Sequence, residues 1–130
     1  MGANAEYVRG FVEAWNRRDL ESYLDDGGPE FEWVVAREHP DATTHRGRDE
    51  VAGYLADWIS TMPDLQIEVE EVEEAGDKVL LVMRMSGSGA GSGAGTVVRV
   101  ATISTLRDGT PLRTEEFLNA DDARRALAAD

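Results

Sequence analysis

The sequence of 130 residues predicts an α+β domain in which a curved, antiparallel or mixed sheet wraps around three N-terminal helices. The first half carries apolar residues at the three- and four-residue spacing of helices, interrupted by one short stretch of strand character. The second half is a series of strand-like stretches separated by turn residues, followed by a helical tail. We expect one domain over residues 1–130. A sheet curled over helices leaves a cone open at one end, which is a natural ligand cavity.

Three helices are predicted in the first half. The first is marked by an apolar stripe at Tyr7, Val8, Phe11, Val12 and Trp15. Asp19 is placed to cap a short second helix at Leu20–Leu24, which the turn residues Asp25–Pro29 end. The third helix begins near Arg48 and ends before Pro63. Its apolar stripe consists of Val51, Tyr54, Leu55, Trp58, Ile59 and Met62.

Strands account for most of the remaining chain. Phe31–Val35 is rich in aromatic and β-branched residues, whereas the polar residues Arg37–Gly47 predict a loop. In the next strand the alternation of apolar and polar residues breaks before Val72, which predicts a bulge near Glu70–Glu71. Val79–Ser86 is largely apolar on both faces, so both faces must be covered.

The glycine-rich segment Gly87–Gly95 leads into a predicted strand at Thr96–Leu106. It lacks the lysine of a phosphate-binding loop and opens no helix, so we interpret it as a hairpin connection. Residues 108–109, Asp-Gly, predict a tight hairpin into Leu112–Leu118. Asn119 can cap a final short helix. The buried face of that helix is predicted to hold Ala123, Ala126 and Leu127.

Composition excludes several classes of protein. The chain has 13 basic and 26 acidic residues, a formal net charge of −13, which argues against nucleic acids and anionic membranes as partners. The absence of cysteine excludes disulfides, thiolate catalysis and thiolate metal sites. No stretch approaches the roughly 18 apolar residues of a membrane span, and no apolar run marks a signal peptide. We therefore expect a soluble, cytoplasmic protein.

Five segments of the chain resemble a known superfamily. They are Val12–Leu20, Pro29–Trp33, Arg46–Val51, Gly87–Gly93 and Leu106–Leu118. Together with the Ala- and Leu-rich tail, they resemble the nuclear transport factor 2-like superfamily, specifically its SnoaL-like, polyketide cyclase-like branch. The resemblance implies the cystatin-like cone shared with ketosteroid isomerases. It does not fix a function, because this fold hosts isomerases, cyclases, hydrolases, dehydratases and non-enzymatic binders.

The resemblance to the steroid isomerases of this fold does not extend to their catalytic residues. Their oxyanion-hole tyrosine falls at Phe11, and their general base falls near Val34 or Val35. Their protonated acid falls at about Thr102. Phenylalanine and valine cannot donate or accept a proton, so that mechanism is absent.

The epoxide hydrolases of the superfamily use two carboxylates bridged by an arginine. The arginine position resembles Arg84 and the second carboxylate resembles Glu116, but the first carboxylate falls at Ser86. That set is incomplete. The best acid–base candidate is Glu116 with Arg84 as its electrostatic partner; the alternative is a structural ion pair between neighbouring strands. Other candidates for a single acid–base residue are Glu32, His39 and His45.

The resemblance also implies which side chains line the cavity. It places Leu80, Val82, Arg84 and Ser86 on the inner face of one strand, and Leu112, Thr114, Glu116 and Leu118 on that of another. Arg84 and Glu116 are therefore expected to pair. We expect Trp58 to be packed on several sides and Trp33 to lie at the cavity mouth. The predicted lining is Phe11, Trp15, Trp33, Tyr54, Trp58, Val82, Ser86, Thr102 and Thr114.

Three functions remain open at this point. One is acid–base isomerisation, cyclisation or hydration of a small, mostly apolar molecule, and the second is binding of such a molecule without turnover. The third is a purely structural dimer. A homodimer through the sheet is expected because the helices can cover only one face of Val79–Met85. No cofactor is expected, and no metal, because His39 and His45 lie in a predicted loop without a second ligand cluster.

Overall fold

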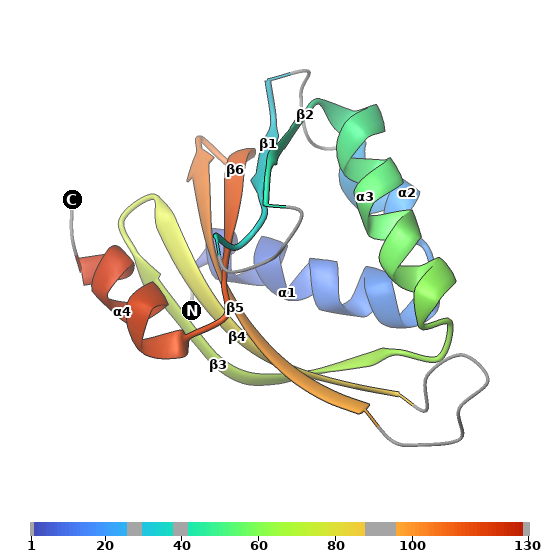
Figure 1. Cartoon of the computed structure of the whole chain (residues 1–130). Helices are drawn as coiled ribbons and strands as arrows, with labels where there is room; N and C mark the ends of the chain where they lie inside the picture. The colour runs from blue at the N-terminus through green and yellow to red at the C-terminus, as the bar shows by residue number, and fades with distance from the viewer. Residues whose placement is uncertain (1, 26–29, 38–41, 88–95, 129–130) are drawn as a thin grey trace.

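The computed structural model describes residues 2–25, 30–37, 42–87 and 96–128. A curved six-stranded sheet holds α1, α2 and α3 on its concave side and α4 on its outer side (Figure 1). This arrangement confirms the predicted α+β fold. Within the described ranges, no helix is both long enough and apolar enough to cross a membrane. The elements are α1 (Ala3–Arg17), α2 (Leu20–Leu24), β1 (Glu32–Val34), β2 (Thr44–Arg46), α3 (Arg48–Thr61), β3 (Gln66–Ala75), β4 (Lys78–Gly87), β5 (Thr96–Arg107), β6 (Thr110–Phe117) and α4 (Ala120–Ala128).

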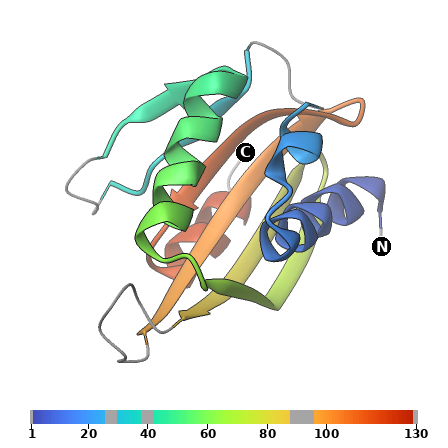
Figure 2. The ribbon, with the colours of Figure 1, turned by 90° about the vertical axis from the view of Figure 1, so that its right-hand side faces the viewer.

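The strand order in the sheet is β2-β1-β6-β5-β4-β3. All neighbours are antiparallel except β1 and β6, which run parallel (Figure 2). Asp108 and Gly109 join β5 to β6 with φ angles of 52° and 80°. Two positive φ values identify the tight hairpin turn predicted from the Asp-Gly pair. The predicted bulge is confirmed as well, because the β3–β4 register shifts between Val69 and Glu71.

Helix α1 is fixed across the sheet by hydrogen bonds to the start of β3. Trp15 Nε1 donates to the Leu65 carbonyl at 2.9 Å. The side-chain amide of Asn16 makes two bonds to Ile67: Nδ2 donates to the carbonyl at 3.0 Å, and Oδ1 accepts from the N–H at 2.9 Å. Asn16 therefore pairs with the open edge of β3 as a neighbouring strand would. It satisfies the N–H and the carbonyl of Ile67, which would otherwise face α1 without a hydrogen-bond partner.

The sheet buries apolar side chains on both of its faces. On β4 the side chains that pack among the helices of the concave side are Val79, Leu81, Met83 and Met85. The alternate residues Leu80 and Val82 are 0% and 5% exposed and pack under α4 with Ala123 and Leu127. The prediction that Leu80 and Val82 face inward is therefore wrong, and α4 covers the second apolar face in this region. The cap of α4 is as predicted: Asn119 Oδ1 accepts from the N–H groups of residues 121 and 122.

Three details of the prediction need correction or fall outside the described residues. Part of the expected loop Arg37–Gly47 forms β2, which pairs with β1. Strands pair through backbone groups, so a polar stretch can form a strand without the apolar pattern from which a strand is predicted. Asp19 stands at the N-cap of α2, but its side chain makes no capping hydrogen bond. Residues 38–41, which include His39, and most of the glycine-rich connection (88–95) lie outside the described residues.

Replacing Asn16 should weaken the attachment of α1. We expect Asn16→Ala to lower the free energy of unfolding by about 1–3 kcal/mol, because it removes two hydrogen bonds and leaves the part-buried backbone groups of Ile67 unpaired. Urea denaturation at 25 °C measures the change. Glu13→Ala, at an exposed position of the same helix, is the control and should change stability by less than about 0.5 kcal/mol. Equal losses in the two variants would contradict this role for Asn16.

Candidate functional site

A narrow, apolar cavity lies between the concave face of the sheet and helices α1 and α3; Figure 2 views the sheet from the side of these helices. Its volume is about 60 Å³. It therefore suits a small ligand. The lining consists of Phe11, Trp15, Trp33, Leu55, Trp58, Met83, Met85, Val98, Val100, Thr102, Glu116 and Leu118.

The aromatic side chains of this lining reach the cavity because the residue spacing of their helix or strand turns them to its inner side. Phe11 and Trp15 are one turn apart on α1, and their ring centroids lie 6.1 Å apart. Trp33 reaches the same space from β1, with its centroid 5.5 Å from that of Phe11. Trp58 closes the cavity from α3. Beyond Phe11 and Trp33, a further void of about 10 Å³ is bordered by Thr114 and other residues of the sheet, α1 and α2.

Glu116 is the acidic member of the cavity lining and accepts hydrogen bonds from neutral donors. Its Oε2 accepts from Trp33 Nε1 at 2.6 Å and from the Tyr54 hydroxyl at 2.7 Å. Its Oε1 accepts from the N–H of Ala36 at 3.4 Å, a long bond that leaves lone pairs available. No ion pair between described residues involves Glu116.

Tyr54 connects α3 to this carboxylate. Burial raises the pKa of the Tyr54 hydroxyl above its ordinary value of 10.0, and the negative charge of Glu116 and the hydrogen bond to it raise it further. A hydrogen bond with Trp58 opposes part of this rise in pKa. The imidazole of His45, on β2, stacks on the Tyr54 ring with centroids 4.7 Å apart. The hydroxyl therefore remains a neutral donor to Glu116.

Threonine side chains extend the polar part of the concave face. Thr102 on β5 lies directly opposite Glu116 on β6, and both line the cavity. Directly opposed residues of antiparallel strands hold their Cβ atoms about 4.5–5.5 Å apart, so the Thr102 hydroxyl is a neighbour of the carboxylate. The next inward pair, Ser104 and Thr114, is joined by a hydroxyl–hydroxyl hydrogen bond of 3.0 Å.

Arg84 does not face the cavity, so the expected Arg84–Glu116 pair is not formed. Its side chain is 37% exposed, and its ion-pair partner is Glu68 on β3, with Nη1 3.7 Å from Oε1. Arg84 alternates with the inward-facing residues of β4 and lies on the outer face with Val82 and Ser86. These three residues were predicted to face inward, and that prediction was wrong: on β4 the residues between them face inward instead. Neutral donors, not an arginine, hold Glu116.

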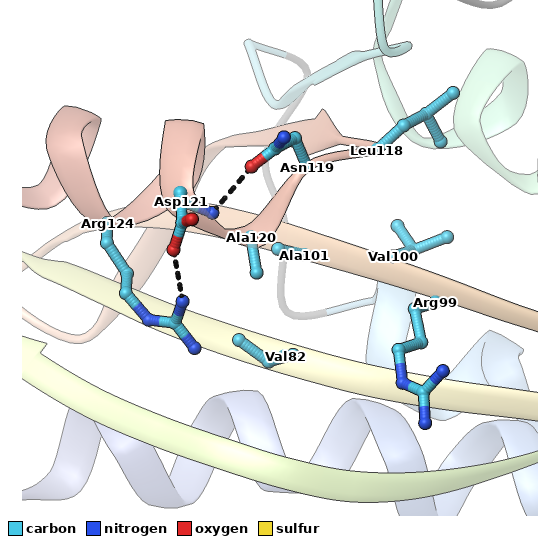
Figure 3. Close-up of a pocket in the computed structure, with 9 residues that line it drawn as sticks. All are labelled: Val82, Arg99, Val100, Ala101, Leu118, Asn119, Ala120, Asp121 and Arg124. Carbon is cyan, nitrogen blue, oxygen red and sulfur yellow. Dashed lines mark hydrogen bonds and ion pairs between the residues drawn. The ribbon is translucent and has the colours of Figure 1, made fainter.

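A second, wider depression lies on the outer face between the sheet and α4, with a volume of about 370 Å³ (Figure 3). Val82, predicted to line the cavity, lies here. The charged groups of this groove neutralise one another: Arg124 Nη1 is 2.7 Å from Asp121 Oδ1, and Arg124 Nη2 is 2.5 Å from Glu71 Oε1. The Arg124 guanidinium also holds the pKa of Glu71 below its ordinary value. Because these charges are satisfied, we place the candidate site in the inner cavity.

The other acid–base candidates do not join Glu116 in the cavity lining. Glu32 pairs with Arg46, with Oε2 and Nε 2.8 Å apart, at the exposed surface. His45 contacts Tyr54 and lies in β2, whereas His39 is outside the described residues. Over the described ranges, no group of three His, Asp or Glu side chains could hold a metal ion.

Trp33 and Trp58 are placed the opposite way to the prediction, in which Trp58 was the more closely packed of the two. Trp33 is only 4% exposed, because β1 lies between β2 and β6 and under the helices, whereas Trp58 is half-buried. Trp33 and Tyr54 orient Glu116 by donating hydrogen bonds to it. The sequence predicted both as residues of the cavity lining and not as hydrogen-bond donors. A signal for that role exists, since a buried Trp N–H or Tyr O–H normally finds an acceptor.

Comparisons with known proteins agree with this fold. A family model described as a SnoaL-like domain matches residues 8–111. A similar solved structure is an NTF2-like protein of unknown function from Burkholderia pseudomallei K96243, with 20% identity over 99% of this chain and 100% of that one and a TM-score of 0.79. Another is a putative SnoaL-like polyketide cyclase from Jannaschia sp. CCS1, with 22% identity over 98% and 93% of the two chains and a TM-score of 0.79.

A third similar structure is a protein with a ketosteroid isomerase-like fold from Catenulispora acidiphila DSM 44928, in complex with trimethylamine. It is 19% identical over 86% of this chain and 84% of that one, with a TM-score of 0.75. No curated protein matches the chain. At these identities the structural likeness shows the shared fold, and the chemistry depends on this chain's own residues.

The raised pKa of Tyr54 predicts a loss of stability in alkali. Above about pH 10 the unfolded chain releases the Tyr54 proton while the folded chain keeps it, so the free energy of unfolding falls as pH rises. Urea denaturation from about pH 9 to about pH 11 should show a steeper decline for the wild type than for Tyr54→Phe. Glu116→Gln should give an intermediate slope, because burial remains after the charge is removed. Parallel curves for the wild type and Tyr54→Phe would contradict this assignment.

Proposed function

The chain belongs to the SnoaL-like domain family, and on that basis we propose that it binds a small, mostly apolar organic molecule in the cavity between the sheet and helices α1 and α3. The observation that carries the proposal is Glu116, a carboxylate held at the wall of an otherwise apolar and aromatic cavity. Apolar walls with few fixed polar groups are typical of sites for small organic ligands.

The hydrogen bonds of the site indicate which polar group the ligand carries. The N–H of Trp33 and the O–H of Tyr54 are both engaged by Glu116 Oε2, and the N–H of Trp15 is engaged by Leu65. Oε1 of Glu116 keeps acceptor capacity. A ligand that donates a hydrogen bond is therefore matched by the carboxylate, whereas a carbonyl oxygen has mainly the Thr102 hydroxyl to accept from.

Known properties of similar structures support a small organic ligand. One of them is a putative polyketide cyclase and another was obtained in complex with trimethylamine. Both share the fold at low identity, so the choice of ligand here depends on this chain's own cavity. All three tryptophans of the sequence line that cavity, which makes their fluorescence a direct probe of its occupation.

Proton transfer by Glu116 is the second candidate function. Oε1 could take a proton from a bound molecule and return it elsewhere on the same molecule, which is enough for an isomerisation or a cyclisation. Hydration needs a further group to activate water, and no second titratable side chain is among the described lining residues. An oxyanion would also be poorly stabilised, because the Tyr54 hydroxyl has a raised pKa and already donates to Glu116. Binding without turnover is therefore better supported.

The matched pair phenol and toluene tests the proposed role of Glu116. We expect both to quench or shift tryptophan fluorescence, because both can enter an apolar cavity and only phenol can donate to the carboxylate. Glu116→Gln should weaken phenol binding about fivefold or more and change toluene binding by less than about twofold, since a hydrogen bond to a charged acceptor contributes about 1.5–3 kcal/mol. Glu115→Gln, on the same strand but ion-paired with Arg113, is the control and should change neither affinity.

Failure of both compounds to bind the wild type would contradict a ligand cavity for small organic molecules. Equal effects of Glu116→Gln on phenol and toluene would contradict the proposed anchoring role of the carboxylate. Incubation of the saturated complex in deuterated water separates the two candidate functions: exchange of a ligand carbon-bound hydrogen that requires Glu116 would favour proton transfer over simple binding.

A homodimer through the outer face of the sheet is also proposed, on a smaller surface than the sequence suggested. Helix α4 covers Leu80 and Val82, and the face beyond it carries Arg84, Arg99 and the exposed side chain of Val97. Both arginines pair with acids of β3, so the face presents charges of both signs, which is compatible with a self-complementary two-fold contact. Light scattering at about 50 μM should give the mass of a dimer for the wild type and of a monomer for Val97→Asp. A monomeric wild type would refute the dimer.

A further inference from the structure

The walls of the cavity around Glu116 are aromatic on several sides. Phe11, Trp15, Trp33 and Trp58 all belong to the lining, and two methionine thioethers complete it from β4. The ring centroids of Phe11 and Trp33 are 5.5 Å apart, so these two rings pack against each other and form one aromatic wall of the cavity. The face of an aromatic ring carries partial negative charge and attracts a cation placed within about 6 Å of its centroid. Such walls distinguish a cationic ligand from a neutral one.

The charge of Glu116 lacks a cationic partner within the described residues. Other acids of the same sheet do have one: Glu32 pairs with Arg46, and Glu70 pairs with Arg99. At Glu116 the partners are an indole N–H, a phenol O–H and a backbone N–H, which orient the carboxylate without neutralising it. These donors satisfy the carboxylate but leave its negative charge in place, so the site can still attract a cation.

The net charge of the whole chain also favours a cationic ligand. A formal net charge of −13 attracts small cations and repels anions, and the cavity carries no positive side chain among its described lining residues. The cavity volume of about 60 Å³ suits a compact head group and not a polycyclic body. A compact, methylated cation meets the size, the aromatic walls and the carboxylate together.

We propose that the ligand of this cavity carries a small alkylammonium group, which lies between Glu116 and the rings of Phe11, Trp33 and Trp58. This inference rests on the proposed function, because it names the chemical class of the molecule that the cavity binds. It also explains why Glu116 is oriented by neutral donors: an arginine in their place would cancel the charge that attracts the ligand. The alkyl groups of the cation contact the rings, and the positive charge faces the carboxylate.

Choline and 3,3-dimethyl-1-butanol provide the test, because they have the same shape and the same hydroxyl and differ in charge. Both are titrated into the wild-type protein, with tryptophan fluorescence and calorimetry as readouts. We expect choline to bind at least about tenfold tighter than the alcohol, since a desolvated cation–aromatic contact and an ion pair act together. Glu116→Gln should weaken choline binding about tenfold and alcohol binding by less than about twofold. Glu115→Gln should leave both affinities unchanged.

A second variant keeps the test valid if Glu116→Gln does not fold. Trp58→Leu, at a half-buried position, should weaken choline binding more than alcohol binding, because leucine retains apolar contact but offers no aromatic face. Equal affinities for choline and the alcohol in the wild type would overturn the alkylammonium proposal and leave an apolar ligand site intact. Choline binding that Glu116→Gln or Trp58→Leu leaves unchanged would place the cation outside the cavity and overturn the proposal as well. If phenol and toluene also fail to bind, the proposed function itself is wrong.

Discussion

Two hydrogen bonds to one oxygen of Glu116 join three separate parts of this fold. Glu116 belongs to β6 in the middle of the sheet, Trp33 belongs to the short strand β1, and Tyr54 belongs to α3. A carboxylate removed from water needs such donors, because burying an unpaired charge is costly. The same atom therefore attaches α3 to the concave face and gives the cavity its polar character. Stability and the polar character of the cavity are coupled at this point, so a change at Glu116 affects both.

Much of the fold could be predicted because local signals were unambiguous. The helical stripe around Trp15 and the one around Leu55 placed α1 and α3, and Pro63 marked the end of the latter. The break before Val72 marked the bulge in β3, and the Asp-Gly pair marked the turn after β5. Each of these signals reflects a physical requirement of the backbone or of one buried face, and neither tertiary contacts nor relatives are needed to detect it.

The register of β4 could not be predicted in the same way. Because Leu80 and Val82 are as apolar as Leu81 and Met83, alternation does not identify the face that meets the helices. The resemblance to other proteins then placed Arg84 inside, one residue out of phase. On β6 the pattern is clearer: Glu116 was correctly placed inside. What the sequence did not reveal was the partner of Glu116, because a tryptophan and a tyrosine at predicted core positions give no indication of which acceptor their polar atoms reach.

The edge strand β3 has a consequence for the behaviour of the protein in acid. Its outer hydrogen-bonding row is occupied at Ile67 by the amide of Asn16, and the rest of the strand carries five glutamates between Glu68 and Glu74. Carboxylates along an exposed edge repel a second strand that would otherwise pair with it. This protection lasts only while the glutamates are ionised. With an isoelectric point of about 4.4, the chain loses its net charge in the same acidic range, so colloidal repulsion and edge protection weaken together. We therefore expect strand-to-strand aggregation of this protein to begin in mild acid.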